Sequence, residues 1–260
     1  MLVLRQLRDY PILLENIQIE VSRALIPLLL IISFPKIAAS QQAKASVALG
    51  VSYGSYALKD LRDFQDFTLL TYRNFIGPDL KSTTRFPAQP AYELNFVVSS
   101  AHWSFGVTTW RSSTGARTDY QDYSGFWRLD MVAIVNGIRG RINYNFKDTN
   151  KGQYYVTIQP GVGFNKLKMT QQVFIQSLTD ESATGSSTSH NVIIMPGLGY
   201  RYSLTNRFFL LAEAKYEWNI SNSGLRMDEN SFLPPPSVNN EPAKVRWDGI
   251  RLVVNIGYDF

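Results

Sequence analysis

Apolar residues recur at every second position in one segment after another beyond residue 41. The clearest segment is the C-terminal one, in which alternate residues stay apolar up to the last position of the chain. These residues are Ile250, Leu252, Val254, Ile256, Tyr258 and Phe260. Because successive side chains of a β-strand point to opposite faces, this period predicts strands with one apolar and one polar face.

Eight segments show the pattern and predict eight strands. They span about 44–56, 92–99, 103–109, 126–146, 153–165, 192–202, 208–220 and 250–260. The fourth segment changes phase, because its apolar residues lie at odd positions over 127–135 and at even positions over 138–146. We therefore expect a β-bulge near Asn136-Gly137, which would bring both halves onto one face. Pro160 interrupts the pattern of the fifth segment locally.

The connections between the predicted strands alternate between long and short. The long ones are 58–90, 112–125, 173–190 and 221–246, and the short ones are 99–102, 147–152 and 203–207. Membrane β-barrels have short turns at one end and long loops at the other. The predicted fold class is therefore all-β: an eight-stranded antiparallel up-and-down transmembrane β-barrel with long extracellular loops and short periplasmic turns.

The polar faces of the predicted strands are rich in Gly and Ser and carry charges of both signs. The charged residues are Glu93, Arg128, Asp130, Arg139, Arg141, Arg201, Glu213, Lys215, Glu217, Arg251 and Asp259. The interior of an eight-stranded barrel has room for side chains but not for a wide pore. Because buried charges must be paired, we expect a network of salt bridges in the lumen rather than a channel.

The apolar faces carry aromatic residues near both ends, as expected at the two interfaces of a membrane. Those near the short turns are Phe96, Trp103, Tyr144, Phe146, Tyr154, Tyr200, Tyr202, Phe208, Tyr258 and Phe260. Those near the long loops are Tyr53, Trp127, Phe164, Tyr216, Trp218 and Trp247. A soluble barrel of the lipocalin type, with the apolar faces inside, has the same alternation and is an alternative.

The N-terminal segment resembles an export signal. Residues 24–34 (ALIPLLLIISF) form an apolar run preceded by Arg23, and small residues at 38–40 predict cleavage after Ser40. The expected division is a signal peptide and upstream segment at 1–40 and a barrel domain at 41–260. Lys36 and the long stretch before the run are atypical, so a translation start downstream of Met1 and a buried helix of a soluble protein are alternatives.

Residues 60–75 (DLRDFQDFTLLTYRNF) depart from the two-residue period and have apolar residues at helical spacing. Asp60 is a candidate N-cap, and Gly77-Pro78 would end the helix. We expect a short helix over the mouth of the barrel, and a docking surface for an external partner is the functional alternative. The segment 231–238 (SFLPPPSV) predicts a stiff, extended loop.

Residues 41–260 resemble the small outer-membrane β-barrel domain family, the porin-like barrels of Gram-negative outer membranes. The resemblance lies in the strand number, the loop alternation and the closing pattern Leu252-x-Val254-x-Ile256-x-Tyr258-x-Phe260. It implies an outer-membrane location, contact with outer-membrane lipid, and a C-terminal strand that the barrel assembly machinery reads. It also implies a structural, surface-interaction or envelope-assembly role through the extracellular loops, with an extracellular or envelope protein as a possible partner.

Little in the sequence indicates chemistry. The chain has no cysteine, which excludes thiolate catalysis, and no basic tract of the kind that suggests a nucleic-acid partner. Some barrels that this chain resembles are lipid-modifying enzymes, and His190 with Ser189 and Glu181 is the candidate site. The composition of residues 183–190 favours a flexible polar loop over a catalytic site. We therefore expect a protein without enzymatic activity and without catalytic, cofactor-binding or metal-binding residues. A lipid-modifying enzyme and a passive small-solute pore are the alternatives.

Two smaller expectations concern isolated residues. His102 lies in a short turn and should be solvated. Asp228 and Glu229 are too few oxygen ligands for Ca²⁺.

Overall fold

A computed structural model describes residues 43–76, 80–100, 102–123, 125–149, 151–175, 179–228, 231, 236–238 and 241–260. The expected signal peptide and the cleavage after Ser40 lie outside these residues, as do residues 232–235 of the proline-rich segment 231–238. The division of the chain at residue 40 therefore stays a prediction. Lys44–Phe260 form one unit, and the description below concerns this unit alone.

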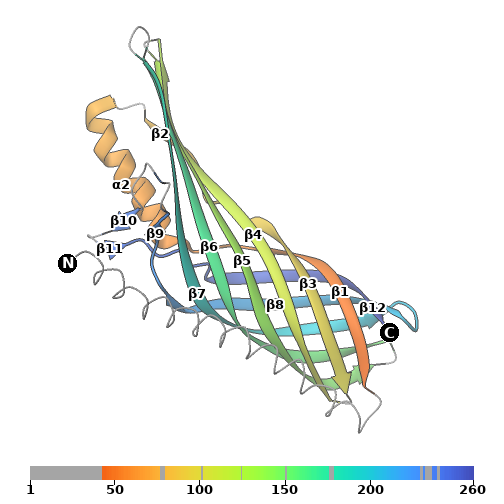
Figure 1. The fold of residues 1–260 in the computed structure, drawn as a ribbon. Coiled ribbons are helices and arrows are strands. Elements are labelled where there is room, and N and C mark those ends of the chain that lie inside the picture. Colours follow the sequence, from red (N-terminus) through yellow and green to blue (C-terminus); the bar gives the residue numbers. More distant parts are fainter. Residues whose placement is uncertain are drawn as a thin grey trace, which may run out of the picture. The chain divides into compact units, whose positions relative to one another are not determined.

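Eight strands of the described residues close into a ring (Figure 1). They are β1 (Lys44–Gly54), β3 (Gln89–Ser100), β4 (Trp103–Asp122), β5 (Gly125–Thr149), β6 (Gly152–Ile175), β7 (Thr179–Ser203), β8 (Phe208–Asn222) and β12 (Gly249–Asp259). Each pairs antiparallel with its neighbour in this order, and β12 pairs back with β1. The predicted fold class is confirmed.

The ring closes where the chain ends. Leu49 of β1 lies opposite Ile256 of β12, and Ser46 lies opposite Asp259. The amide of Phe260 donates to the carbonyl of Ala45 at 2.9 Å. Short turns join β3 to β4, β5 to β6 and β7 to β8 at this end, as predicted. The edge strands that an open sheet would expose are therefore paired with each other.

Four strands are much longer than a bilayer requires. β4, β5, β6 and β7 have 20, 25, 24 and 25 residues, whereas about 9–11 residues span a membrane. The expected loops at 112–125 and 173–190 were wrong in this respect, because most of their residues continue these strands. The flexible loop expected at 183–190 is likewise part of β7, with Thr188 opposite Lys166 of β6.

The bulge expected at Asn136-Gly137 was also wrong. β5 pairs with β4 in unbroken register through this point, with Trp110 opposite Gly137 and Arg111 opposite Asn136. The odd positions of β5 therefore face inward along its length, with apolar Val135 in phase with Arg139 and Arg141. The lining of the barrel thus changes from charged to apolar along one regular strand.

The long connection from β1 to β3 contains α2 (Lys59–Ile76) and β2 (Lys81–Arg85). The helix is present as predicted. The helix begins at Lys59, so Asp60 lies in its first turn rather than at the N-cap position, and its carboxylate accepts a hydrogen bond from the Lys244 amide at 2.9 Å. Among the described residues, no helix is long and apolar enough to cross a membrane.

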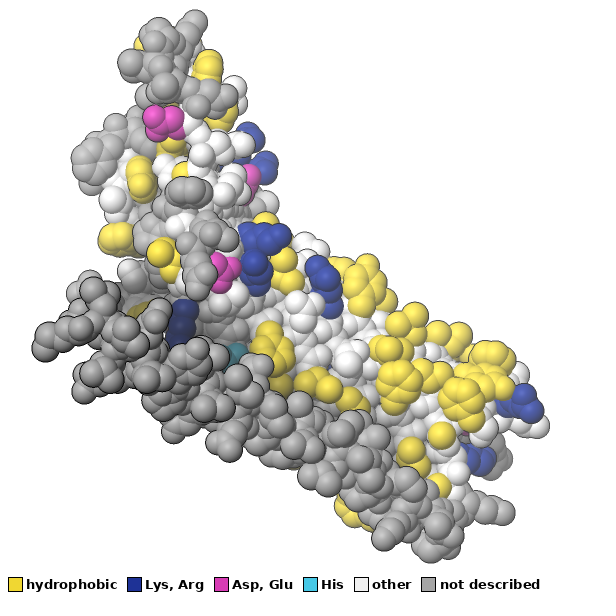
Figure 2. Space-filling view, in the orientation of Figure 1, with side chains coloured by type: hydrophobic (Ala, Val, Ile, Leu, Met, Phe, Trp, Pro, Cys, Tyr) yellow, Lys and Arg dark blue, Asp and Glu magenta, His cyan; other side chains and the backbone are white. Residues whose placement is uncertain are grey.

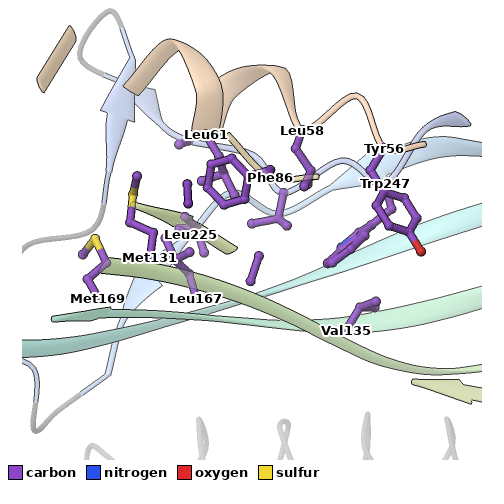
Figure 3. Packing of buried hydrophobic residues seen from close by; sticks show 14 of the residues in the cluster. Tyr56, Leu58, Leu61, Phe86, Met131, Val135, Leu167, Met169, Leu225 and Trp247 are labelled. Atoms are coloured by element: carbon purple, nitrogen blue, oxygen red, sulfur yellow. The ribbon is translucent and has the colours of Figure 1, made fainter. Parts of the chain in front are cut away.

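The connection from β8 to β12 contains short β pairings: β9 (Arg226–Met227), β10 (Ser237–Val238) and β11 (Glu241–Pro242). β9 pairs with β7, and β10 pairs with β11. A hydrophobic core lies between this connection, α2 and the inner faces of the long strands. Figure 3 shows Leu58, Leu61 and Phe86 packed toward the strands that carry Met131 and Leu167.

Candidate functional site: the barrel wall, the lumen and the extracellular platform

The apolar faces of the membrane-crossing segments point outward. Leu252 and Val254 of β12 expose 58% and 61% of their surface, whereas Arg251 and Asn255 on either side of them are buried. β1 and β8 alternate in the same sense, with Leu49 and Trp218 outside. An apolar exterior around a polar interior is the arrangement of a membrane barrel and the reverse of a soluble one. The lipocalin-type alternative is therefore wrong.

Aromatic side chains form a girdle at the short-turn end. The rings of Tyr154 and Tyr200 are tilted against each other with centroids 4.5 Å apart, and the Tyr258 ring lies 5.2 Å from that of Phe208 and 5.4 Å from that of Phe260. At the other edge, Tyr53, Phe164, Tyr216 and Trp218 are exposed on the wall as predicted. Trp127 and Trp247, which were expected in that belt, are instead buried in the internal core.

A network of buried ion pairs fills the lumen at the height of the membrane. Glu93 pairs with Arg139 at 3.0 Å and with Lys215 at 3.1 Å. Glu213 pairs with Lys215 at 3.1 Å and also with Arg141, which the Tyr155 hydroxyl contacts at 3.2 Å.

A further buried pair, Arg251 with Glu217, lies beside this network. Each of these charges contacts an opposite charge, as burial at low dielectric requires. The predicted salt-bridge lumen is confirmed for these residues.

Other charges assigned to the lumen lie elsewhere. Arg128 and Asp130 occupy even positions of β5 and face outward, where Asp130 pairs with the exposed Arg117 at 2.5 Å. The phase change expected at Asn136-Gly137 had placed them inside. Arg201 and Asp259 form a half-buried pair at the short-turn end, 2.6 Å apart.

Three aromatic residues separate the charge network from the apolar core, and we call them the aromatic layer: Tyr56, Trp110 and Trp247. The Arg139 guanidinium lies 4.4 Å from the centre of the Trp110 ring, and that of Arg251 lies 5.0 Å from Tyr56. Tyr56 and Trp247 meet edge to face at 4.7 Å. Cations thus lie against the aromatic faces on one side, and apolar side chains pack on the other.

Below this layer, a small cavity of about 30 Å³ lies toward the short-turn end, lined by residues that include Arg141, Tyr155 and Arg201. A cavity of this size has room for about two water molecules. The buried side chains of the charge network occupy the lumen at mid-height.

Above the aromatic layer lies a unit that we call the extracellular platform: α2 and the described residues of 112–135, 165–189 and 225–246. Its core includes Leu61, Met131 and Leu167, each fully buried. Arg62 donates to the carbonyls of Tyr56 and Phe86 at 3.1 and 3.2 Å. These contacts fasten α2 to the segments on either side of it.

Polar contacts also join α2 to the strands. The buried Gln65 amide donates to the Ser82 hydroxyl at 2.7 Å and to the Thr84 carbonyl at 2.9 Å. The outer side of the helix leaves apolar side chains uncovered, with Phe67 and Leu70 exposed by 62% and 66%. Tyr123, at the turn between β4 and β5, is also exposed. The platform is thus internally packed and presents apolar side chains to the outside.

The candidate serine-histidine site is not assembled. Ser189 and His190 are consecutive residues of β7 and point to opposite faces, with Ser189 buried and His190 exposed. The Ser189 hydroxyl accepts a hydrogen bond from the amide of Asn165 at 3.2 Å. A nucleophile and its base need hydrogen-bond contact, which this strand geometry prevents. His102 is exposed in its turn, as expected.

Asp228 binds protein groups. Its carboxylate accepts hydrogen bonds from Ser186 and Thr188, and Lys166 lies 3.5 Å away. The Ser186 hydrogen bond, helped by the charge of Lys166, lowers the pKa of Asp228 below its usual range. Within the described parts of the chain, no group of acidic and histidine residues has the arrangement of a metal site.

An apolar exterior, two aromatic edges and a paired-charge interior define an integral β-barrel of the outer-membrane type. No family model matches the chain, and no curated protein matches it. Similar solved structures include the attachment invasion locus protein Ail of Yersinia pestis in complex with the heparin analogue sucrose octasulfate. It has 11% identity and a TM-score of 0.34, over 84% of this chain and 99% of that one.

Two further similar structures are Neisserial surface protein A and the N-terminal β-barrel domain of Pseudomonas aeruginosa OprF. The first has 11% identity and a TM-score of 0.37, over 84% of this chain and 97% of that chain. The second has 11% identity and a TM-score of 0.28, over 83% of this chain and 97% of that chain.

Proposed function

We propose that this protein is a non-enzymatic outer-membrane barrel that presents its extracellular platform to a partner at the cell surface or within the envelope. The observation that carries the proposal is the apolar core that joins α2 to the inner faces of β4 to β7. A packed core outside the membrane holds the exposed surface in one conformation. Preorganisation of this kind reduces the entropic cost of binding.

The exposed apolar residues of the platform are the candidate contact points. Phe67 and Leu70 lie on α2, and Tyr123 lies at the far end of the β4–β5 hairpin. Large apolar side chains of this kind are enriched in the centres of protein interfaces. The sequence suggested either a helix that covers the mouth of the barrel or a docking surface for an external partner. Both roles are compatible, because one face of α2 packs on the barrel and the other face is available to a partner.

A passive pore is less well supported. The fully buried Arg139, Arg141 and Arg251 occupy the lumen at mid-height, and the aromatic layer lies above them. An open pore would require these ion pairs to separate inside the barrel, where each charge depends on its partner.

A lipid-modifying enzyme built on His190 is likewise less well supported, because Ser189 lies on the opposite face of the strand. Replacing His190 by Ala tests it directly. Under our proposal the lipid profile of the membrane is unchanged, and a loss of modified lipid would contradict it.

Assembly is a second expected contact. The C-terminal strand β12 ends at Phe260, whose ring is exposed beside Tyr258 in the aromatic girdle. We infer that the outer-membrane assembly machinery engages this strand before it closes the ring against β1.

Site-specific photo-crosslinking in living cells tests the surface role. A photoreactive amino acid replaces Phe67 or Leu70 in separate variants, and Leu198 of β7, similarly exposed but on the membrane wall, serves as the control position. We expect discrete protein adducts from the two helix positions and none from position 198. Absence of adducts at the helix, or the same adducts from the wall position, would contradict the proposal.

A further inference from the structure

A shallow depression of about 370 Å³ lies on the outer wall of the barrel where β1, β3, β4 and β5 meet. Its lower row is largely apolar, with Leu49, Leu94 and Thr109 opposite one another on successive strands. Its upper row is polar, because Tyr92 lies opposite Arg111, which lies opposite Asn136. The depression thus has an apolar half toward the membrane centre and a cationic half toward the outside.

Two further cations face outward above this row. Lys166 and Lys168 of β6 lie two and four positions beyond Phe164, which is opposite Asn136. Figure 2 shows Lys and Arg side chains just beyond the yellow apolar side chains of the wall.

The acidic side chains near these cations pair with other groups. Asp130 pairs with Arg117, and Glu93, which also lines the depression, pairs with Arg139 and Lys215. Asp228 pairs with Lys166 at 3.5 Å. In the described residues no carboxylate forms an ion pair with Arg111 or Lys168. Arg111 and Lys168 therefore carry positive charge that no described carboxylate pairs with.

The row lies at the height of the outer headgroups. From Trp103 in the inner girdle to Arg111, β4 rises about 27 Å, or about 21 Å along the membrane normal at a tilt of about 40°. From Tyr154 to Lys166, β6 rises about 31 Å along the normal by the same estimate. The apolar band of such barrels is about 25 Å tall, so these cations flank its outer edge.

We propose that this depression binds a phosphorylated lipid of the outer leaflet. Its acyl chain lies along Leu49, Leu94 and Thr109, one phosphate group contacts Arg111, and a second phosphate group of the same headgroup lies further out, near Lys166 and Lys168. Arginine and lysine are the usual phosphate ligands, and each cation at a membrane surface strengthens the binding of anionic lipid. The apolar lower half selects a lipid over a free phosphate ion. The inference is independent of the extracellular partner proposed above.

The test compares two probes that differ only in phosphate: a bis-phosphorylated lipid A and its dephosphorylated form. The full-length barrel is purified in a non-ionic detergent, and lipid retention is measured by native mass spectrometry over a lipid titration. We expect the wild type to retain the phosphorylated form at least fivefold more tightly. The double variant Arg111→Gln, Lys168→Gln should lose about ten- to thirtyfold in affinity for it.

Two matched variants make the result specific. Lys147→Gln removes an exposed cation at the opposite, short-turn end of β5 and should leave retention unchanged. Arg111→Lys keeps the charge and should retain most of the binding, and heat-dependent gel migration verifies that each variant is folded. Equal retention of both probes, equal loss in Lys147→Gln, or displacement of the lipid by equimolar inorganic phosphate would overturn the proposal.

Discussion

At the scale of single residues, Gly137 marks the height at which the lining of the barrel changes from charged to apolar. Arg139 lies below it in the charge network and Val135 lies above it in the core. The ring of Trp110, from the neighbouring strand, fills the space over Gly137, where a Cβ atom would overlap it. Glycine is needed here because only a residue without a side chain leaves room for the Trp110 ring. The apolar residues change from odd to even positions near Gly137 because the inward-facing side chains of β5 change from apolar to charged, while the strand itself stays regular.

Replacing Gly137 by Ala should therefore displace Trp110 and destabilise the barrel by about 1–3 kcal/mol, as overpacking typically does. The control is Gly140→Ala, because the nearest atoms to a Cβ there are 3.8 Å away. Urea unfolding followed by tryptophan fluorescence measures both variants. Equal stability of the two would show that the Trp110 ring does not depend on this glycine.

Glu213 is the residue on which two buried cations depend, since both Arg141 and Lys215 pair with it. The change Glu213→Gln leaves these cations partly uncompensated and should cost about 3–5 kcal/mol of folding free energy. The exposed pair of Asp66 with Arg85 provides the comparison, and Asp66→Asn should cost less than about 1 kcal/mol. Denaturant titration in detergent distinguishes them, and similar losses would argue against a tightly packed charge network.

At the scale of secondary-structure elements, α2 converts the ends of β4 to β7 into a packed platform. Leu58 and Phe86, on either side of the helix, adopt φ angles of 39° and 46°. Such left-handed conformations cost about 1–2 kcal/mol each for ordinary residues. Their full burial and the hydrogen bonds from Arg62 offset this cost. The helix and its flanking turns are therefore held as one element.

Leu61→Ala should loosen that element without unfolding the barrel. A fully buried leucine typically contributes about 2–5 kcal/mol to its core, whereas Leu70→Ala on the exposed side should change stability by less than about 0.5 kcal/mol. Hydrogen exchange over 59–76 reports the local effect, and heat-dependent gel migration reports the barrel. If Leu61→Ala leaves exchange of the helix at the wild-type rate, the platform does not depend on this core.

Element by element, α2 was predictable because its apolar spacing and the Gly77-Pro78 stop are local signals. The outer halves of β6 and β7 were not predictable, because residues such as Ser187 and Thr188 have turn-like composition and no apolar alternation. Pairing with neighbouring strands outweighs their weak intrinsic preference, as is usual for strands. The surroundings of His190 were predicted wrongly for the same reason. We expected a loop there, whereas the residues form a strand, in which the consecutive side chains of Ser189 and His190 point to opposite faces.

At the scale of the whole molecule, two environments surround one barrel. In the membrane the wall is apolar and the lumen is charged, whereas from the outer headgroups onward the inner face is apolar and the outer face carries Arg111, Lys166 and Lys168. In each half, most apolar residues lie away from water. Because the apolar residues lie on the outer face in one half and on the inner face in the other, charged side chains fill the lumen of the first half and an apolar core fills the second.

Planar-bilayer recording tests the closed lumen. We expect the purified barrel to give no steady conductance, because buried ion pairs fill its mid-height. A double variant, Arg141→Ala with Glu213→Ala, removes one such pair and should show brief openings if it folds. Steady, ion-selective openings from the wild type would contradict the closed lumen and favour the pore.

Local pattern alone was sufficient to predict eight strands, their closure into a barrel and the helix at 60–75. The outward direction of Leu252 and Val254 needed further signals: the aromatic residues near both strand ends, the charges of both signs on the polar faces and the apparent export signal. Alternation and helical spacing are properties of neighbouring residues, and the membrane sorts the faces of short strands in a uniform way. Three-dimensional packing was needed to show how far β4 to β7 extend and that Trp127 and Val135 face inward. The physical reason is that the apolar face of a strand points outward where lipid surrounds the barrel and inward where water surrounds it. The alternation of residues is the same in both cases, and only the packed structure shows at which height the apolar face changes sides.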